Sequence, residues 1–308
     1  MSIGLDKLIR DTCICLCMNL PLHIVDVFAE AQYEGNQLAV FIDEEGLSSE
    51  LMQKLAREMH FSETTFITAQ DKKNRVFKVR IFTVESELPF AGHPTLGTAY
   101  IAQKVLLGEK VEKLTLDLKA GMIPVEFEYE NDEPNVLWMR QLPPEFGETH
   151  PVEVFAELLG LEQEDFDKDY PIQEVSTGVY FYMIPLKTRD ALLRVKINHE
   201  KLAEYSKDKK AKWPFMFTRE TDNPENQIKA RMITRFTEDP ATGSANGCFA
   251  GYLVKHKYFG DSNIDVRVEQ GAEVQRPSIL YLRASEKSDG IEVNVGGKVA
   301  YVAKGHLV

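Results

Sequence analysis

Two stretches of the sequence carry the residue types that proton-transfer chemistry needs. The first reads RIFTVESELPFAGHPTLGTAYI over residues 80–101, and the second reads RFTEDPATGSANGCFAGYL over residues 235–253. Each places acids before a proline, then pairs a glycine with a polar residue, as in Gly92-His93 and Gly243-Ser244, before an apolar segment. The stretches lie about half the chain length apart, which indicates that the chain makes the same kind of turn twice.

Each of these turns predicts a helix that begins at a glycine. The N-terminus of a helix presents backbone N–H groups without partners and a partial positive charge, and both favour anions. Glycine also lets a ligand approach the backbone closely. We therefore expect the amides at Gly92 and Gly243 to bind the carboxylate of a small-molecule substrate, across a cleft between two similar domains.

Acid–base groups for such a site are present near both turns. Glu63, in FSETTF, follows a predicted helix and starts a predicted strand, so its side chain can project into a cleft. His93 and Asp239 flank the two helix starts, and Ser244 can cap its helix or donate to a ligand. Glu238 stands beside Asp239, and a like charge there is expected to raise a carboxyl pKa.

Each of these residues also has a purely structural interpretation. A glutamate after a helix, such as Glu63, is most often solvated. His93 can serve as a helix cap, and an aspartate before proline, such as Asp239, often only forms a turn. Glu85 and Glu87 are expected in a solvated loop. The sequence has no Walker loop, no G-x-G-x-x-G after a strand, no H-E-x-x-H and no G-x-S-x-G.

The elements that position these residues repeat in the same order. Alternating apolar residues predict strands over residues 22–30, 37–43, 62–69 and 75–84, and an amphipathic helix lies over 47–60. The helix from Pro94 through Leu106 is apolar almost all round, which is typical of a buried helix. The second half repeats this order, with strands followed by a largely apolar helix after Ser244. The next strand is broken at Gly271, just as the corresponding strand of the first half is broken at Gly121.

This repeat predicts an α+β fold of two pseudo-symmetric domains, each a bent, mostly antiparallel sheet around one buried helix. We expect an N-terminal extension at residues 1–17, a first domain at 18–130 and a second at 131–308, with the last strand able to return to the first domain. The polar segment YENDEPN, residues 129–135, is the best candidate for the linker.

Composition restricts the class of protein. The 308 residues include 36 Lys and Arg against 48 Asp and Glu, a net charge of −12. This disfavours a sequence-independent nucleic-acid partner, which needs dense Lys and Arg, and an anionic membrane surface. The apolar run near the N-terminus is too short to span a membrane. We expect a cytoplasmic protein with no nucleic acid and no membrane among its partners.

The four cysteines give no sign of a metal centre. Cys13, Cys15 and Cys17 alternate within the N-terminal extension, which is not a zinc-ligand spacing, and no histidine pair follows. Lipidation of these cysteines is an open alternative. Cys248 lies in the predicted buried helix and is interpreted as a small core residue. No metal and no cofactor are expected.

Five motifs in order, GNQLAVF, FSETTFI, RIFTVESELPFAGHPTLGTAY, EDPATGSANG and VEQGAEVQRPSILYLRA, resemble the phenazine-biosynthesis-like (PhzF-like) family from about Leu22 to the C-terminus. The resemblance implies the fold of diaminopimelate epimerase, cofactor-free proton chemistry on a dihydro-3-hydroxyanthranilate-type acid, and a homodimer. The family's catalytic glutamate matches Glu63, and its histidine matches His93.

By the same resemblance, Asp239 and Ser244 match the family's aspartate and serine, and Gly92 and Gly243 offer amides to the substrate carboxylate. The related epimerases use two cysteines at the helix starts, where this chain has His93 and Ser244. The early turn departs from the family's usual Gly-Asn-Pro.

We therefore expect an isomerase in which Glu63 acts as base and then as acid, while His93 and Asp239 position the substrate. A racemase or epimerase of an amino-acid-like acid is one alternative. The other is a non-catalytic module that binds a small molecule or a protein.

Overall fold

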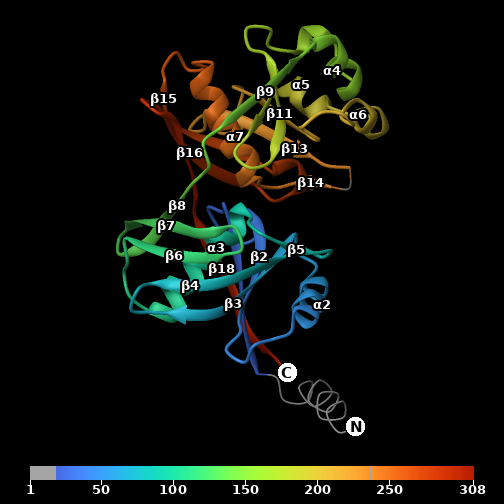
Figure 1. Cartoon of the computed structure of the whole chain (residues 1–308). Helices are drawn as coiled ribbons and strands as arrows, with labels where there is room; N and C mark the ends of the chain where they lie inside the picture. The colour runs from blue at the N-terminus through green and yellow to red at the C-terminus, as the bar shows by residue number, and fades with distance from the viewer. Residues whose placement is uncertain (1–18, 236) are drawn as a thin grey trace.

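The computed structural model describes residues 19–235 and 237–308, and it has two lobes stacked along the long axis (Figure 1). The expected N-terminal extension and its three cysteines lie outside the described residues. Secondary structure is mixed α and β, with sheet predominant. Among the residues described, no helix is long and apolar enough to cross a membrane.

The first half forms the lower lobe of Figure 1. Its elements in chain order are β1 (Leu20–Val27), β2 (Asn36–Ile42), α2 (Ser49–Met59), β3 (Glu63–Asp71), β4 (Val76–Phe82), β5 (Glu87–Leu88), α3 (Gly92–Ile101), β6 (Lys113–Leu118), β7 (Gly121–Glu130) and β8 (Glu133–Arg140). β2 is parallel to β3, and β3 is antiparallel to β4. β4 then pairs antiparallel with β5 and parallel with β6, after which β6, β7 and β8 form an antiparallel meander.

The second half forms the upper lobe, except for its last strand, β18, which lies in the lower lobe beside β1. Its elements are β9 (Glu145–His150), α4 (Val152–Leu159), β10 (Ile172–Ser176), β11 (Tyr180–Pro185), α5 (Arg189–Arg194), α6 (His199–Tyr205), β12 (Trp213–Thr218), β13 (Ile228–Ile233), β14 (Glu238–Asp239), α7 (Gly243–Lys255), β15 (Asn263–Gln270), β16 (Ser278–Lys287), β17 (Gly290–Gly297) and β18 (Val299–Leu307). Short 3-10 turns occupy Gln163–Asp165 and Ala272–Val274.

The strand pairings of the second half follow those of the first. β11 is parallel to β12, β12 is antiparallel to β13, and β13 pairs antiparallel with β14 and parallel with β15. β15, β16 and β17 are antiparallel, like β6, β7 and β8. The halves are joined where β8 pairs with both β7 and β17, and where β18 runs back along β1 (Figure 1).

A largely apolar helix fills the centre of each lobe. All residues of α3 from His93 to Ile101 are buried, and so are eleven of the thirteen residues of α7. Their apolar side chains, including Leu96, Ile101, Phe249 and Leu253, belong to one core that continues through both lobes. The expected buried helices are therefore confirmed, because a helix without a charged or polar face can be surrounded by sheet.

Two local expectations are corrected. The helix predicted through Leu106 is α-helical only to Ile101, and Ala102–Leu107 forms a π-helical turn that ends at Gly108 in the left-handed conformation. The segment 129–135 is not a linker. Asn131 and Asp132 both have positive φ and form the tight turn of the β7–β8 hairpin, a conformation that Asn and Asp tolerate better than other non-glycine residues.

Candidate active site

The N-termini of α3 and α7 meet at the junction of the lobes. A Cβ atom built on Gly92 would lie 3.5 Å from Cα of Gly243, so the two helix starts are close neighbours with no room for more than a methyl group between them. Neither helix has a side-chain hydrogen bond capping its first turn. Two helix ends with unpaired amides therefore point toward the same place, where an anion is favoured.

A cavity of about 490 Å³ opens at this contact. It is lined from the first half by Asn36, Ser62, Glu63, Leu88, Pro89, Phe90, Ala91, Gly92 and His93, and from the second by Val179, Met232, Thr234, Thr237, Glu238, Asp239, Pro240, Ala241, Thr242, Gly243 and Ser244. All six site residues proposed from the sequence therefore lie in its wall. Their roles in catalysis stay predictions.

Glu63 and His93 face each other in this wall. Glu63 is the first residue of β3, and His93 is the second residue of α3. Glu63 Oε2 lies 3.4 Å from His93 Nε2, and neither atom has a hydrogen-bond partner within residues 19–235 and 237–308. The side chain of Glu63 is only 18% exposed and that of His93 only 7%. The expectation that a glutamate after a helix is solvated is therefore wrong for Glu63.

Burial sets the protonation of both groups. It raises the pKa of Glu63 to about 8, with a smaller contribution from the charge of Asp239. It lowers the pKa of His93 to about 3, and a hydrogen bond to the backbone of Gln37 opposes this only in part. Because this contact raises the pKa, it favours the protonated ring, as a backbone carbonyl acceptor does. At neutral pH a protonated Glu63 therefore faces a neutral histidine.

Asp239 is held by hydrogen bonds from both halves. Its Oδ1 accepts from Asn36 Nδ2 at 2.9 Å, and its Oδ2 accepts from the Thr242 hydroxyl at 2.7 Å. The side chain of Gln270 donates to the backbone carbonyl of Asp239 and to the Thr242 hydroxyl. Burial raises the pKa of Asp239 to about 6, against the opposing effect of these donors. Asp239 is therefore mainly ionised at neutral pH, in contrast to Glu63.

The repulsion between like charges that was expected for Glu238 and Asp239 acts instead between Asp239 and Glu63. It is the charge of Asp239 that raises the pKa of Glu63. Glu238 instead binds Arg231 through two hydrogen bonds of 2.8 and 2.7 Å. Glu87, expected in a solvated loop, makes the same two-pronged contact with Arg80.

Residues 25–305 match the family model described as phenazine biosynthesis-like protein. The chain belongs to this family. It is 31% identical over 296 residues to an uncharacterized isomerase of Clostridium acetobutylicum, covering 93% of this chain and 97% of that one. A Pseudomonas aeruginosa relative, named trans-2,3-dihydro-3-hydroxyanthranilate isomerase, is 32% identical over 289 residues, covering 92% of this chain and 97% of the relative.

The fold agrees with solved structures of the family. The crystal structure of a Bacillus anthracis protein of the PhzF family matches with a TM-score of 0.85 and 27% identity, covering 95% of this chain and all of that one. The mixed α and β architecture expected from the resemblance is therefore confirmed.

None of the described residues that line the cavity of this family member is a cysteine. Ser244 lines the cavity at the start of α7 without capping the helix. Cys248 is fully buried on the same helix, where it accepts from the Thr177 amide, and burial raises the pKa of its thiol to about 11. The interpretation of Cys248 as a core residue is confirmed. Over residues 19–235 and 237–308, no group of three or more His, Cys, Asp or Glu could hold a metal ion.

Sequence reasoning missed the residues that hold Asp239 in place. Asn36, Thr242 and Gln270 are uncharged and gave no signal of their own, although Asn36 stands in the motif GNQLAVF and Gln270 in VEQG. Arg276, from the second half, was also missed. Its guanidinium donates to Asp26 Oδ1 at 2.6 Å and to the Gly35 carbonyl at 2.9 Å, beside Asn36.

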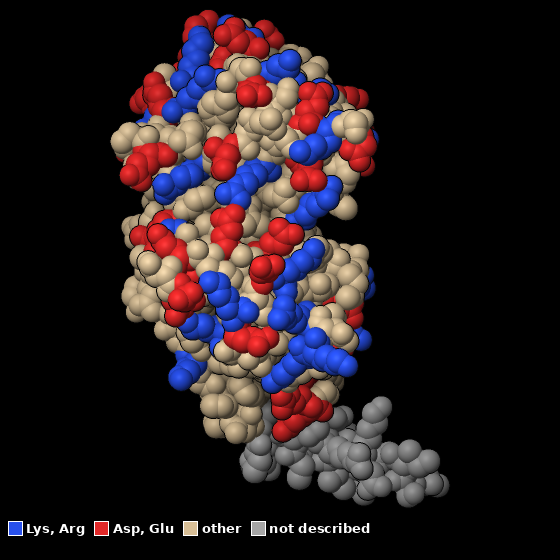
Figure 2. All heavy atoms as spheres, turned by 90° about the vertical axis from the view of Figure 1, so that its left-hand side faces the viewer, with Lys and Arg blue, Asp and Glu red and all other residues tan. Residues whose placement is uncertain are grey.

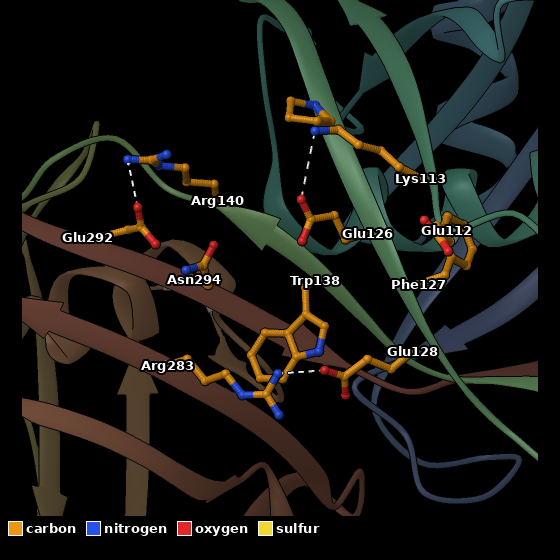
Figure 3. Close-up of a pocket in the computed structure, with 11 residues that line it drawn as sticks. Glu112, Lys113, Glu126, Phe127, Glu128, Trp138, Arg140, Arg283, Glu292 and Asn294 are labelled. Carbon is orange, nitrogen blue, oxygen red and sulfur yellow. Dashed lines mark hydrogen bonds and ion pairs between the residues drawn. The ribbon is translucent and has the colours of Figure 1, made fainter.

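A larger hollow of about 670 Å³ lies on another part of the junction, between β7, β8, β16 and β17 (Figure 3). Three ion pairs line it, namely Arg140–Glu292, Lys113–Glu126 and Arg283–Glu128. On the face shown in Figure 2, acidic and basic side chains are likewise interspersed. Each acid of these pairs has a basic partner, whereas Oε2 of Glu63 in the smaller cavity has no hydrogen-bond partner among the described residues. The smaller cavity is the candidate active site.

Proposed function

We propose that this family member is a cofactor-independent isomerase, which moves one proton between two carbon atoms of a small carboxylic acid. One observation carries the proposal. Glu63 has a buried carboxyl oxygen without a hydrogen-bond partner, and its pKa is raised to about 8 at a cavity lined by both halves. A general base and acid works best with a pKa near the working pH.

In the proposed mechanism, the amides at Gly92 and Gly243 bind the substrate carboxylate, which the partial positive charge of two helix ends favours. Ionised Glu63 removes a proton from one carbon, and the resulting carboxylic acid returns that proton to another. Neutral His93 adds no positive charge that would lower the pKa of Glu63, and Ser244 donates to the substrate. Anionic Asp239 keeps the pKa of Glu63 high, so that the acid form persists long enough to complete the transfer.

The first substrate to test is trans-2,3-dihydro-3-hydroxyanthranilate, because the P. aeruginosa relative is named for its isomerisation. The proposal also includes two pseudo-symmetric domains, at residues 18–130 and 131–308, of the diaminopimelate epimerase type. It further includes a cytoplasmic homodimer. The repeated order of strand pairings supports the pseudo-symmetry. Light scattering of the purified chain measures the oligomeric state.

A racemase or epimerase that uses two thiols has less support. The two helix starts carry His93 and Ser244, and Cys248 is buried with a raised pKa. A non-catalytic binding module would keep the cavity, but it would have no need of a carboxyl group desolvated without a partner, which costs stability. The two alternatives differ from the isomerase in what happens to the substrate protons.

The test is turnover in D₂O, followed by NMR. The wild type should convert trans-2,3-dihydro-3-hydroxyanthranilate or a substrate found by screening, with deuterium entering the product carbon or the original proton returning to it. Glu63→Gln keeps the shape but cannot accept a proton, so turnover should fall by about 10²–10⁴. Substrate affinity should stay within about tenfold, because the backbone amides bind the carboxylate.

The matched control is Glu58→Gln, the same substitution at an exposed position of α2 five residues away. It should leave turnover unchanged. Near-normal turnover of Glu63→Gln would assign the proton transfer to another group, with Asp239 and His93 the next to be substituted. Tight substrate binding by the wild type without any proton transfer would favour the binding module.

A further inference from the structure

The hairpins that follow α3 and α7 differ in the length of their turns. In the first half, the pairing of β6 with β7 continues to Leu118 and Gly121, so only residues 119 and 120 close the turn. In the second half, the pairing of β15 with β16 stops at Gln270 and Ser278, which leaves residues 271–277 between the strands. Two residues suffice to close an antiparallel hairpin. The longer segment of the second half is therefore available for other contacts.

One end of this segment packs against the turn that carries Asp239. Gly271 has a φ of +82°, and a Cβ atom built on it would lie 2.5 Å from the carbonyl oxygen of Pro240. Only glycine fits there, because the conformation is left-handed and the neighbouring backbone leaves no space. The amide of Arg276 donates back to the Gly271 carbonyl at 3.0 Å. The segment therefore folds back on itself directly behind the residue that follows Asp239.

The other end of the segment contacts the first half through Arg276. Its guanidinium donates to Asp26 Oδ1 at 2.6 Å, to the Gly35 carbonyl at 2.9 Å and to the Glu34 carbonyl. The next residue, Pro277, accepts from the Gly35 amide at 2.8 Å. The side chain of Asp26 is only 2% exposed and that of Arg276 is 21% exposed. One side chain of the second half thus holds three oxygen atoms of the first half.

The turn that Arg276 holds leads directly into Asn36. The second oxygen of Asp26 accepts from the amide of Tyr33 at 2.7 Å, so the turn is held near its start as well as at Gly35. Asn36 is buried, and its side chain donates to Asp239 Oδ1 at 2.9 Å. The direction of this donor depends on the backbone that carries it, and that backbone is held by a residue of the other half.

We propose that Arg276 is a positioning residue of the active site, which fixes the turn of residues 33–36 and thereby the hydrogen bond from Asn36 to Asp239. The kinetic consequence rests on the proposed function, whereas the hydrogen bonds do not. Arg276 is not among the residues that line the cavity, so it acts through Asn36. The position needs an arginine, because a planar guanidinium presents several donors in a fixed fork and a lysine ammonium is a single point charge.

The decisive variant is Arg276→Lys, which keeps the positive charge and loses the fork. The pKa of Asp239 should rise, because the hydrogen bond from Asn36 lowers it. With a substrate that the wild type isomerises, kcat/KM should fall about fivefold, as for a weakened hydrogen bond to a charged group. NMR titration of the carboxyl carbon of labelled aspartate measures the pKa, and steady-state kinetics measure the second quantity.

A double variant tests whether Arg276 acts through Asn36. Asn36→Leu removes the donor itself, so adding Arg276→Lys should change kcat/KM by less than about twofold more and leave the pKa of Asp239 where Asn36→Leu puts it. Residues that act through one shared contact are not additive in this way. Fully additive losses would show that Arg276 acts by another route and would overturn the proposal.

The matched control is Arg283→Lys. Arg283 is also an arginine of the second half that binds an acid of the first, donating to Glu128 at 2.6 Å, and it binds Asp265 at 3.1 Å. This change should leave both kcat/KM and the pKa of Asp239 as in the wild type. If Arg276→Lys lowers the melting temperature but leaves these two quantities unchanged, Arg276 serves stability alone and the proposal is wrong.

A second variant decides the proposal if Arg276→Lys does not fold. Asp26→Asn loosens the same turn from the opposite side, because an amide has one acceptor oxygen for the two donors, Arg276 and the Tyr33 amide. Loss of a negative charge would by itself lower the pKa of Asp239, so a rise identifies a weakened bond from Asn36. An unchanged or lowered pKa would contradict the proposal.

The outcome is separable from that of the proposed function. A raised pKa of Asp239 in Arg276→Lys, in a protein whose wild type shows no proton exchange in D₂O, would support the positioning role and reject the isomerase. Proton exchange by the wild type, together with an unchanged pKa of Asp239 in the variant, would do the reverse.

Discussion

The turns before α3 and α7 share a backbone and differ in their side chains. Each turn is closed by an Arg–Glu ion pair seven residues apart, and each leads to a helix that begins at a glycine. The two glycines are close neighbours at the junction of the lobes. Their other positions diverge, with Leu88 opposite Asp239 and His93 opposite Ser244. Two copies of the same backbone provide two similar sets of amide donors, as binding of one anion by both helix starts requires. Proton transfer by a single base needs only one such carboxylate, so its residues need no duplicate. In the proposed mechanism, anion binding is therefore symmetric, whereas the acid–base chemistry is not.

The two Arg–Glu pairs differ in burial as well. The side chains of Arg231 and Glu238 are 10% and 11% exposed, and those of Arg80 and Glu87 are both 25% exposed. Arg231 also donates to the carbonyl of Leu192. The second half therefore holds its turn, and with it Asp239, by a more deeply buried pair than the first half needs for Leu88.

The largest effect should come from removing the buried acid of that pair. Glu238→Gln leaves Arg231 without its charge partner, and breaking a buried pair in this way typically costs about 3–5 kcal/mol of unfolding free energy. Glu87→Gln makes the same change at the more exposed pair and should cost about 1 kcal/mol or less. Urea unfolding at pH 7 measures both. Equal losses would show that the two turns are equally supported and that their difference in burial has no energetic consequence.

Asp239→Asn should have the next largest effect, on activity. We expect kcat/KM to fall about a hundredfold, because the change removes a charge that acts on the proton shuttle. The pH profile gives a specific sign. The charge of Asp239 raises the pKa of Glu63, so its removal lowers that pKa. The rising limb of kcat/KM, set in the wild type by loss of the Glu63 proton near pH 8, should move to lower pH.

The control for Asp239→Asn is Leu88→Met, a conservative change at the equivalent position of the first half. It should change kcat/KM no more than about threefold and leave the pH profile in place. A comparable shift of the limb in both variants would mean that the limb reports something other than the Asp239 charge.

Much of this arrangement could be predicted from the sequence, and the reason is local. GHP and TGSANG give the helix starts because glycine and proline restrict the backbone over a few residues. Glu63 could be placed at a strand start because an amphipathic helix ends shortly before it. The Arg80–Glu87 pair could also have been expected, since a tight antiparallel turn brings residues seven apart together on one face.

What could not be predicted depends on distant segments meeting. Burial of Glu63 and the unpartnered state of its carboxyl follow from packing of the two lobes, which no local pattern encodes. Asn36 reaches Asp239 across 203 residues. That Leu88 takes the place of Asp239 in the first half follows only from the strand register. A register shift of one residue would turn each side chain to the opposite face.

The buried carboxyl of Glu63 should lower the free energy of unfolding as the pH rises. Folding raises the pKa of this acid from its ordinary value near 4.5 to about 8, so the folded state binds the proton more tightly between these values. Its contribution to the unfolding free energy therefore falls as pH rises from 4.5 to 8. Glu63→Gln removes this cost, and should make the protein on the order of 2 kcal/mol more stable than the wild type at pH 8.

At pH 4 the same variant should gain nothing, because Glu63 is then protonated in both the folded and the unfolded state. Thermal melts at the two pH values measure the difference, with Glu58→Gln as the control at an exposed position. No gain at pH 8 would mean that folding does not raise the pKa of Glu63, as for a carboxyl that is well solvated or hydrogen-bonded in the folded protein. Strand register places Trp213 of the second half where the first half has Glu63. The replacement of an uncharged residue by an acid at this position would then have no energetic cost.

The smallest expected effect tests the bond that joins the asymmetric pair. Asn36 donates to Asp239 at 2.9 Å and to the carbonyl of Ala241 at 3.2 Å, so it holds the second half's turn against β2 of the first half. Asn36→Leu should reduce kcat/KM about tenfold, near the lower end for a hydrogen bond to a charged group. It should also raise the pKa of Asp239, because that bond lowers it.

The matched control is Val179→Ile. Strand register places Val179, just before β11, where the first half has Asn36 at the start of β2. This change should have less than a threefold effect on kcat/KM and none on the pKa of Asp239. The pKa is measured by NMR titration of the carboxyl carbon of labelled aspartate. If Asn36→Leu leaves it unchanged, the donors from Thr242 and Ala241 suffice to hold the carboxylate. The contact between the halves would then serve packing alone, and the asymmetry of the site would lie entirely in Glu63 and Asp239 themselves.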